Sequence, residues 1–258
     1  MQAVILAAGN SSRFYPFNTE HKSEFIIAGK AIICYTIESL IKAGIENAVV
    51  VISPKSNIKK LLTVYEDKLK IEYVIQDEPK GAGNALILCE KYLEDQFFLM
   101  NASHLDFHEF KEKMLSKSDA KVVLLAKKEK DVSQYGILKV KNDLVLDIIE
   151  KPDSANELSN LRVIGIYLFK KEFLQTLKDT PTQHYQLESA LSLETQKGNV
   201  KFTETSDEIL TLKFAWNLFN LKNYILDRLP NYISKSAIIS KSAIIEGNVF
   251  IEDGVRVL

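Results

Sequence analysis

The sequence predicts an α/β protein in which a doubly wound mixed sheet precedes a short parallel β-helix. Three observations lead to this fold class. Strand-like and helix-like patterns alternate from residue 1 to about residue 229, which is typical of a sheet covered by helices. From residue 230 the apolar period changes to six, which is typical of a β-helix. The chain, with 258 residues of which 46% are hydrophobic, is long enough to bury the core that this fold requires.

The first half of the chain shows the β-α alternation most clearly. Residues 2–7 form an apolar run that ends at Gly9, and residues 32–43 then have the apolar spacing of a helix that stops at Gly44. The alternation continues with strand patterns at 48–52, 71–76 and 97–100, and with helical patterns at 54–66, 83–93 and 107–115. This order predicts parallel strands joined by helices on both faces of a sheet.

From Lys121 onward, the pattern of the sequence predicts an inserted antiparallel region. Short strand patterns occur at 122–126, 136–140, 145–150 and 163–169. Helical patterns return at 171–177, 187–195 and 214–229. We therefore expect a first domain over residues 1–229 with a mixed sheet.

Residues 230–258 form the second expected domain, because their apolar pattern has a period of six. Aliphatic residues stand at every sixth position, and a small or aliphatic residue follows four places later: Ile233, Ile239, Ile245, Ile251 and Val257, then Ala237, Ala243, Val249 and Val255. The repeat predicts a parallel β-helix that stacks these side chains inward, and the alternative is a β-rich tail. So short a solenoid has an open end. We therefore expect a truncated chain, or a homo- or hetero-oligomer in which another subunit covers that end.

Charge and composition exclude several classes of partner. The chain has 33 basic and 34 acidic residues and no basic stripe, so a nucleic-acid partner is not expected. The longest apolar runs have the length of strands, so no membrane span is expected. Met1 leads directly into a strand pattern without a signal segment, and Cys34 and Cys89 lie in helix-like apolar patterns. We therefore expect a cytoplasmic protein with two buried thiols.

The loop after the first strand is a candidate phosphate site. Residues 6–13 are LAAGNSSR, and Lys22 follows nine residues after Arg13. Open α/β sheets bind ligands at loops of this kind, where backbone N–H groups and nearby cations can hold phosphates. The loop is neither a P-loop nor a GxGxxG fingerprint. From the residues alone it is either a phosphate site or an ordinary polar loop.

Six segments match one known family pattern, in order and over the whole chain. The segment LAAGNSSRFYPFNTEHKSEF is similar to the signature LAAGxGTRxxPxTxxxPK. The other five segments are Gln76 with Gly81, Tyr135-Gly136, Glu150-Lys151-Pro152, Gly165-Ile166-Tyr167 and Trp216-Asn217-Leu218. In these motifs the chain resembles the sugar-1-phosphate nucleotidylyltransferases. The resemblance implies their Rossmann-like doubly wound mixed sheet, the nucleotide-diphospho-sugar transferase fold, followed by a short left-handed β-helix segment.

The resemblance also implies a reaction, in which a sugar-1-phosphate attacks the α-phosphorus of a nucleoside triphosphate and pyrophosphate is released. Such a step depends mainly on positioning and charge neutralisation. Two residues would act on the phosphates, the pyrophosphate being held by Arg13 and the α-phosphate by Lys22. The nucleotide would contact Leu6, Ala7, Ala8, Gly9, Gln76 and Gly81, with Gln76 reading a pyrimidine. The sugar and its phosphate would contact Gly136, Glu150 and Lys151.

The chain departs from the family pattern at the residues that carry the chemistry. The Gly-x-Gly-Thr loop is Gly-Asn-Ser-Ser here, and Ser11 adopts a positive φ poorly, which would distort the phosphate loop. The two aspartates that bind Mg²⁺ in the family correspond to Ser103 and Thr211, whose neutral hydroxyls hold Mg²⁺ weakly. We therefore expect impaired turnover. Other groups near these positions could replace the metal ligands: Asp106, Glu208, or a site made of His104, Asp106 and His108.

Two functions of different classes stay open. The first is a working nucleotidylyltransferase with an unusual metal site. The second is a catalytically silent relative that binds a nucleotide sugar or a sister subunit, as regulatory pyrophosphorylase subunits and translation initiation factor subunits of the family do. A third reading, a cytidylyltransferase for choline phosphate, matches only the first domain. The departures favour a silent or impaired protein that still binds a pyrimidine nucleoside triphosphate or a nucleotide sugar.

Overall fold

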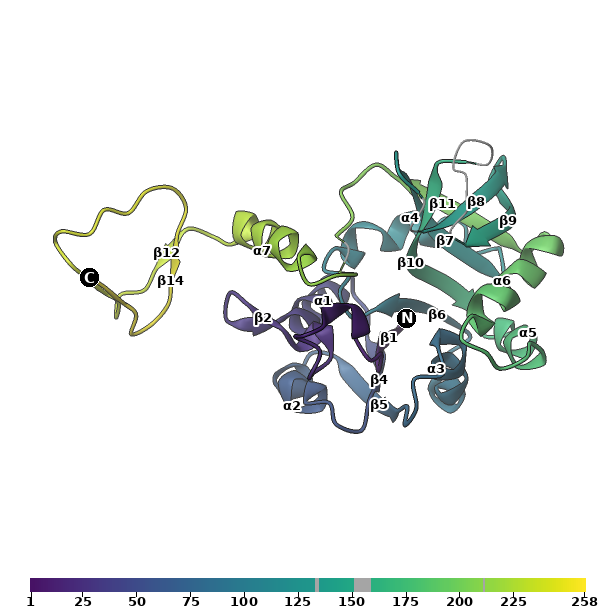
Figure 1. The fold of residues 1–258 in the computed structure, drawn as a ribbon, viewed down its shortest axis with the longest axis horizontal. Coiled ribbons are helices and arrows are strands. Elements are labelled where there is room, and N and C mark those ends of the chain that lie inside the picture. The colour runs from purple at the N-terminus through teal and green to yellow at the C-terminus, as the bar shows by residue number, and fades with distance from the viewer. Residues whose placement is uncertain (133–134, 151–158, 211) are drawn as a thin grey trace. The chain divides into compact units, whose positions relative to one another are not determined.

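The computed structural model describes residues 1–132, 135–150, 159–210 and 212–258, and the chain divides into two compact units, Met1–Ala215 and Trp216–Leu258. Over the described residues, nine strands of the first unit form one sheet in the order β5-β4-β1-β6-β10-β7-β11-β9-β8 (Figure 1). Their bounds are β1 Gln2–Ala7, β4 Asn47–Ile52, β5 Lys70–Ile75, β6 Gln96–Asn101, β7 Val122–Lys128, β8 Gly136–Lys141, β9 Leu144–Glu150, β10 Leu161–Lys170 and β11 Val200–Thr205.

The sheet is mixed, as the sequence predicts. Strands β5, β4, β1 and β6 are parallel, whereas β10 runs antiparallel to both β6 and β7. Strand β11 pairs in parallel with β7, and β8 and β9 form an antiparallel pair. Strand β11 was not predicted from the sequence, although Val200 and Phe202 are buried and alternate with the partly exposed Lys201.

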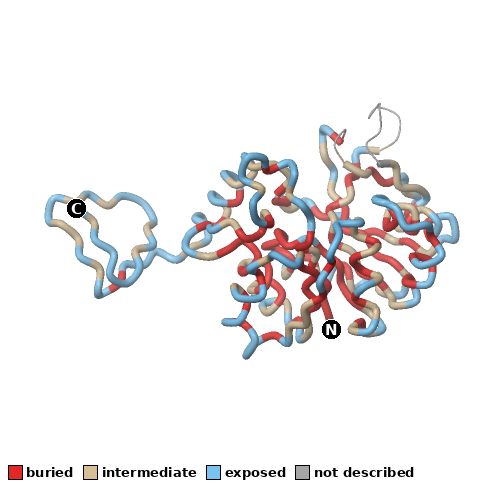
Figure 2. The backbone as a smooth tube through the Cα atoms, turned by 60° about the horizontal axis from the view of Figure 1, so that its bottom comes forward, coloured by how far each residue is buried: buried red, intermediate tan, exposed pale blue. Residues whose placement is uncertain are grey.

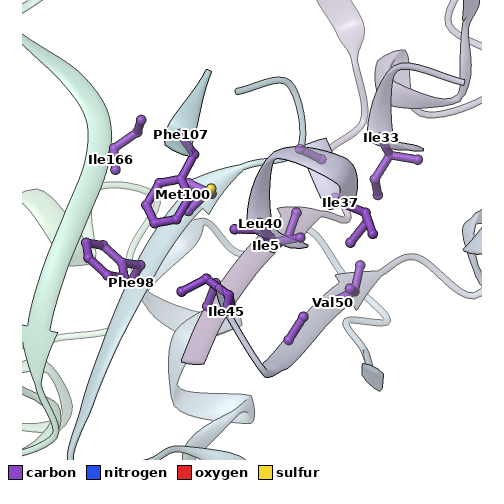
Figure 3. Packing of buried hydrophobic residues seen from close by; sticks show 14 of the residues in the cluster. Ile5, Ile33, Ile37, Leu40, Ile45, Val50, Phe98, Met100, Phe107 and Ile166 are labelled. Atoms are coloured by element: carbon purple, nitrogen blue, oxygen red, sulfur yellow. The ribbon is translucent and has the colours of Figure 1, made fainter. Parts of the chain in front are cut away.

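Helices cover both faces of the sheet because neighbouring strand residues point to opposite sides. Along β1, Ala3 and Ile5 join one buried cluster, and Val4 joins the other. The first cluster includes side chains of α1 (Ile32–Lys42), α2 (Ile58–Leu62) and α4 (Lys111–Leu115), and Figure 3 shows its centre. The second includes side chains of α3 (Ala82–Leu88), α5 (Phe173–Asp179) and α6 (Gln186–Gln196). Figure 2 shows the buried residues concentrated between these layers.

Short elements fill the connections. Five 3-10 turns are described: η1 Ser12–Phe14, η2 Lys22–Glu24, η3 Thr63–Tyr65, η4 Glu90–Tyr92 and η5 Phe107–Glu109. A two-stranded hairpin joins β2 (Ile26–Ile27) to β3 (Lys30–Ala31). The helix expected at 54–66 is shorter than predicted, because the Ser56 hydroxyl accepts a hydrogen bond from the Ile58 N–H and α2 begins there. The helix expected at 107–115 is divided into η5 and α4.

The order of the strands creates a switch point between β1 and β6. After β1 the chain adds β4 and β5 on one side, and then returns to place β6 on the other side. Leu6 of β1 is level with Asn101 of β6, so the two strands end at the same edge. Ligands of open α/β sheets bind at the carboxyl ends of strands at such a point.

The second unit contains a helix followed by short parallel strand pairs. Helix α7 spans Asn217–Arg228, and β12 (Tyr232–Ile233), β13 (Ile238–Ile239), β14 (Phe250–Ile251) and β15 (Arg256–Val257) follow. Tyr232 pairs with Phe250 and Ile238 with Arg256, so both pairings join residues three hexads apart. Ile239 and Ile251 are half-buried, whereas Ile244 is 85% exposed. Among the described residues, no helix has the length and apolar character needed to cross a membrane.

Candidate functional site

Two adjoining cavities lie in the first unit at the switch point. Cavity A has a volume of about 420 Å³ and is lined by the loop after β1, the end of β6, and residues around Gln76 and Gly81. Cavity B has a volume of about 260 Å³ and is lined by residues that follow β6, by the start of β8 and by β10. Four residues line both cavities: Arg13, Lys22, Asn101 and Lys213. The two cavities are therefore neighbouring parts of one site.

The structure gathers most of the residues that the sequence singles out. Cavity A is lined by Leu6, Ala8, Gly9, Arg13, Lys22, Gln76 and Gly81. Cavity B is lined by Ser103 and Gly136 in addition to Arg13 and Lys22. Ala7 is fully buried in the core and lines neither cavity.

The remaining candidates lie elsewhere or cannot be described. Asp106 is 1% exposed and lines neither cavity, and Glu208 is exposed. Glu150 pairs through its backbone with Gly136, which lines cavity B, but its side chain lies outside the described part of the structure. Lys151 and Thr211 also lie outside the described residues.

The loop after β1 keeps a left-handed residue although its glycine is replaced. Ser11 has φ 50° and ψ 30°, a conformation that costs an L-residue about 1–2 kcal/mol. Its hydroxyl accepts a hydrogen bond from the Lys22 N–H at 2.9 Å. Ser11 therefore links the loop to the backbone that carries Lys22, which a glycine could not do.

Lys22 is held at the junction of the two cavities. Its Nζ donates to the carbonyl oxygen of Leu212 at 2.6 Å. Burial, reinforced by the positive charge of Arg13, lowers the pKa of Lys22 to about 8. Burial, with a smaller contribution from Lys22, also lowers the pKa of His21 to about 3, so His21 is neutral near pH 7.

Gln76 is fixed in one orientation at the far side of cavity A. Its Nε2 donates to the Asn84 Oδ1 at 2.9 Å and to the Gly81 carbonyl oxygen at 3.2 Å. The side-chain Oε1 is therefore the atom left to accept a hydrogen bond. Gly81 has φ 96°, and a Cβ at this position would lie 2.5 Å from the carbonyl oxygen of His184, so only glycine fits.

Cavity B contains two further cations around one aromatic ring. The Arg162 guanidinium carbon lies 4.3 Å from the centre of the Tyr135 ring, and the Lys213 Nζ lies 5.1 Å from it. Arg162 is 5% exposed and forms an ion pair with Glu129 at 3.3 Å. His104 is also buried, and its Nδ1 has no hydrogen-bond partner among the described residues. Burial first, and then the charges of Lys22 and Arg162, lower the pKa of His104 to about 4, so this ring is neutral near pH 7.

The described residues do not fit a Mg²⁺ ion. Mg²⁺ prefers anionic oxygen ligands. The described residues that line cavities A and B include no Asp or Glu, and Ser103 contributes only a neutral hydroxyl. Nowhere in the described parts of the chain do three His, Cys, Asp or Glu side chains gather as metal ligands.

The alternative site of His104, Asp106 and His108 is therefore wrong. The two histidines have different surroundings, because His104 lines cavity B. His108 instead contacts α1, where its Nδ1 is 2.9 Å from the Ser39 Oγ and its Nε2 is 2.8 Å from the Lys42 Nζ.

Several polar residues of the site were not predicted from the sequence, among them Asn101, Arg162 and Lys213. Asn101 could have been found, because it ends a buried strand at a switch point. Arg162 also left a signal, since an arginine inside the apolar run of a strand is unusual. Lys213 lies in a segment without a pattern, and only the fold brings it to the site.

The fold and the switch-point site define an α/β protein with two adjoining cavities at the carboxyl edge of its sheet, where several cations come together. The model of the Nucleotidyl transferase family matches residues 2–217. The chain belongs to this family, and within it to the sugar-1-phosphate nucleotidylyltransferases.

Curated relatives match over most of the chain. A UTP–glucose-1-phosphate uridylyltransferase of Haloferax volcanii is 30% identical over 214 residues, which are 77% of this chain and 85% of that protein. A bifunctional sugar-1-phosphate nucleotidylyltransferase/acetyltransferase of Sulfurisphaera tokodaii is 30% identical over 236 residues, 89% of this chain and 56% of that protein. The bifunctional protein GlmU of Methanococcus maripaludis is 26% identical over 91% of this chain. The chain thus spans about half the length of these bifunctional relatives.

Solved structures share the fold at low sequence identity. A putative glucose-1-phosphate thymidylyltransferase from Bacillus anthracis has a TM-score of 0.78 at 20% identity, over 87% of this chain and 94% of that chain. A UDP-glucose pyrophosphorylase complexed with UDP-glucose has a TM-score of 0.73 at 19% identity, over 88% and 99%. A UTP-bound UGPase from Acinetobacter baumannii has a TM-score of 0.74 at 20% identity, over 89% and 94%.

Proposed function

We propose that this chain binds a pyrimidine nucleoside triphosphate or a nucleotide sugar, with the nucleotide in cavity A and the sugar in cavity B. The observation that carries the proposal is the junction of the cavities, which Arg13, Lys22 and Lys213 all line. These cations stand where the phosphates between a base and a sugar would lie, and charge-assisted hydrogen bonds to phosphate are strong.

The orientation of Gln76 supports a uracil or thymine base. Its Oε1 is available as an acceptor because Nε2 donates to Gly81 and Asn84. Uracil and thymine carry an N–H at ring position 3, which complements this acceptor, whereas cytosine presents a lone pair there. The names of the relatives and the contents of the structural neighbours, which include UTP and UDP-glucose, agree with this base preference.

The family reaction would join a nucleoside triphosphate to a sugar-1-phosphate and release pyrophosphate, and we propose that its turnover here is impaired. Arg13 and Lys22 can hold the phosphates, and Ser11 helps to fix Lys22. However, the described walls of the site provide no carboxylate to hold a catalytic metal. The same observation favours a second candidate function, a catalytically silent subunit that binds a nucleotide sugar for regulation or assembly.

We also propose that residues 230–258 begin a left-handed β-helix through which subunits associate. The parallel pairings three hexads apart support this arrangement, because three hexads complete one coil of such a helix. The greater length of the bifunctional relatives agrees with it.

The binding proposal is tested by calorimetric titration with UTP, CTP and UDP-glucose. We expect UTP and UDP-glucose to bind with dissociation constants below about 1 mM, and CTP to bind more weakly than UTP. Asn84→Ala should lower the ratio of UTP to CTP affinity by roughly fivefold, because the Gln76 amide loses the acceptor that fixes it. Asn84→Asp is the matched control, since it keeps that acceptor and should keep the ratio. If none of the three ligands binds at about 1 mM, the proposed function is wrong.

A further inference from the structure

His21 lies in the wall of cavity A, immediately before Lys22. It is 9% exposed, and it also lines a third cavity, cavity C, of about 290 Å³, which shares residues 8–10 with cavity A. The family signature has a proline before its lysine, and a proline side chain neither donates nor accepts a hydrogen bond. A hydrogen-bonding ring at this position is therefore a feature of this chain and not of the family pattern.

The contacts of His21 determine which ring nitrogen carries the proton. The backbone N–H of Ser23 donates to Nδ1 at 3.2 Å, and the Ser23 Oγ lies 2.7 Å from the same nitrogen. Because a backbone N–H can only donate, Nδ1 is an acceptor, and the proton of the neutral ring is on Nε2. Among the described residues, none forms a hydrogen bond with Nε2. The Nε2–H is therefore a donor left for a ligand.

The ring provides this donor without adding a charge. Burial, with a smaller contribution from the ammonium of Lys22, lowers the pKa of His21 to about 3, so the imidazole is neutral near pH 7. An imidazolium at this place would be repelled by Lys22, which lines the same cavity. A neutral N–H can contact a phosphate oxygen beside Lys22 without this repulsion, and hydrogen bonds to an ionised acceptor are strong.

The segment that carries His21 is held in place by its own hydrogen bonds. The Lys22 N–H donates to the Ser11 Oγ at 2.9 Å, which joins η2 to the loop after β1. The Glu24 N–H donates to the His21 carbonyl oxygen at 2.8 Å. The buried carboxylate of Glu24 accepts from the Ser56 Oγ at 2.9 Å, which joins η2 to the segment before α2. A donor that is already oriented loses little conformational entropy when a ligand binds.

We propose that the Nε2–H of His21 donates a hydrogen bond to a phosphate oxygen of the ligand in cavity A, as a neutral partner of Lys22. The inference rests on the proposed function for the identity of the ligand, and it adds a phosphate contact that the family pattern does not contain. The contact belongs to cavity A and not to cavity C, because Lys22 lines only cavity A of these two and its charge reaches the ring.

Two substitutions separate the Nε2 donor from the Nδ1 acceptor. In His21→Gln the amide nitrogen can take the place of Nε2, so the donor stays while the acceptor for the Ser23 N–H is lost. In His21→Asn the amide oxygen can take the place of Nδ1, so the acceptor that caps η2 stays while the donor is lost. The two variants make opposite changes, and each is the matched control of the other.

The test is calorimetric titration of the full chain with UTP and with inorganic pyrophosphate near pH 7. We expect His21→Asn to weaken the binding of both ligands about tenfold, because a hydrogen bond to a charged oxygen is lost. His21→Gln should stay within about twofold of the unmodified protein. Melting temperatures without ligand should show the reverse order, with His21→Asn the more stable of the two, because it keeps the cap of η2.

NMR of isotopically labelled imidazole nitrogens tests the tautomer in the unmodified protein. The chain has four histidines, and the signal that is missing from a folded His21 variant identifies the ring. We expect the proton on Nε2, and we expect its resonance to shift when pyrophosphate is added. A proton on Nδ1, or an Nε2–H resonance that saturating pyrophosphate leaves unchanged, would contradict the proposal.

The outcomes separate the inference from the proposed function. Binding by the unmodified protein that His21→Asn retains in full would overturn the inference and leave the proposed function standing. Equal weakening by His21→Asn and His21→Gln would also overturn the donor role, because it would show that only the structure around His21 matters. If neither UTP nor pyrophosphate binds to the unmodified protein, the inference fails, and the proposed function fails with it only if UDP-glucose does not bind either.

Discussion

At the scale of single residues, the groups of the site with shifted pKa values differ in whether their charge changes near neutral pH. His21 and His104, with pKa values lowered to about 3 and about 4 by burial, stay neutral. Lys22 is different, because burial and Arg13 lower its pKa to about 8. The anion affinity of the site should therefore follow the protonation of Lys22.

The pH dependence of pyrophosphate binding tests this role. A bound anion favours the charged ammonium, so the pKa of Lys22 rises on binding and the complex takes up a proton at pH values above about 8. The affinity of the unmodified protein, divided by that of Lys22→Arg, should thus fall as pH rises from about 7 to about 9.5. Arginine stays charged throughout, so the ratio also cancels the titration of pyrophosphate itself. A ratio that stays constant with pH would show that Lys22 does not titrate at the site.

At the scale of elements, the loop between β1 and η1 shows how the family's glycine was replaced. Ser11 keeps the left-handed conformation that its φ of 50° records, and its hydroxyl bonds to the Lys22 N–H. The sequence predicts that Ser11 distorts the loop. Instead, Ser11 itself adopts the strained conformation, and its hydrogen bond to Lys22 compensates for the strain.

Two substitutions at Ser11 separate the strain from the hydrogen bond. Ser11→Ala loses the hydrogen bond but keeps the strain, and we expect it to lower the free energy of unfolding by about 1 kcal/mol. Ser11→Gly loses the same bond but removes the strain, so it should be more stable than Ser11→Ala by about 1 kcal/mol. Urea denaturation measures both values. An alanine variant as stable as the glycine variant would show that the left-handed conformation is not strained.

The sequence predicted those elements whose patterns are local. The period-2 and period-3.6 patterns located β1, α1, β4 and β6 to within one residue at each end. Strand β11 was missed because four of its six residues are Lys, Thr or Glu, although Thr203 and Thr205 are buried in the structure. At the site, Arg13, Lys22 and Gln76 were found because they lie in local motifs. Arg162 and Lys213 were not, because tertiary structure brings them there: Arg162 lies on β10, which pairs with β6, and Lys213 lies in the segment after β11.

At the scale of the whole molecule, membership of the family does not by itself imply the family's catalytic activity. The family model covers residues 2–217, and Arg13, Lys22 and Gln76, which the sequence predicts for the site, line one cavity at the switch point. The described walls of the site lack the carboxylates that Mg²⁺ needs. We therefore expect a protein that retains its ligand but turns over slowly.

The most direct test of this account is the rate of pyrophosphate release. Purified protein is mixed with UTP or dTTP, a panel of sugar-1-phosphates and Mg²⁺, and pyrophosphate is measured over time. The account predicts rates at least ~10³-fold below the range of about 1–10³ s⁻¹ typical of enzymes, with UTP bound under the same conditions. Mg²⁺-dependent release at a rate within that range, from any sugar-1-phosphate of the panel, would contradict it.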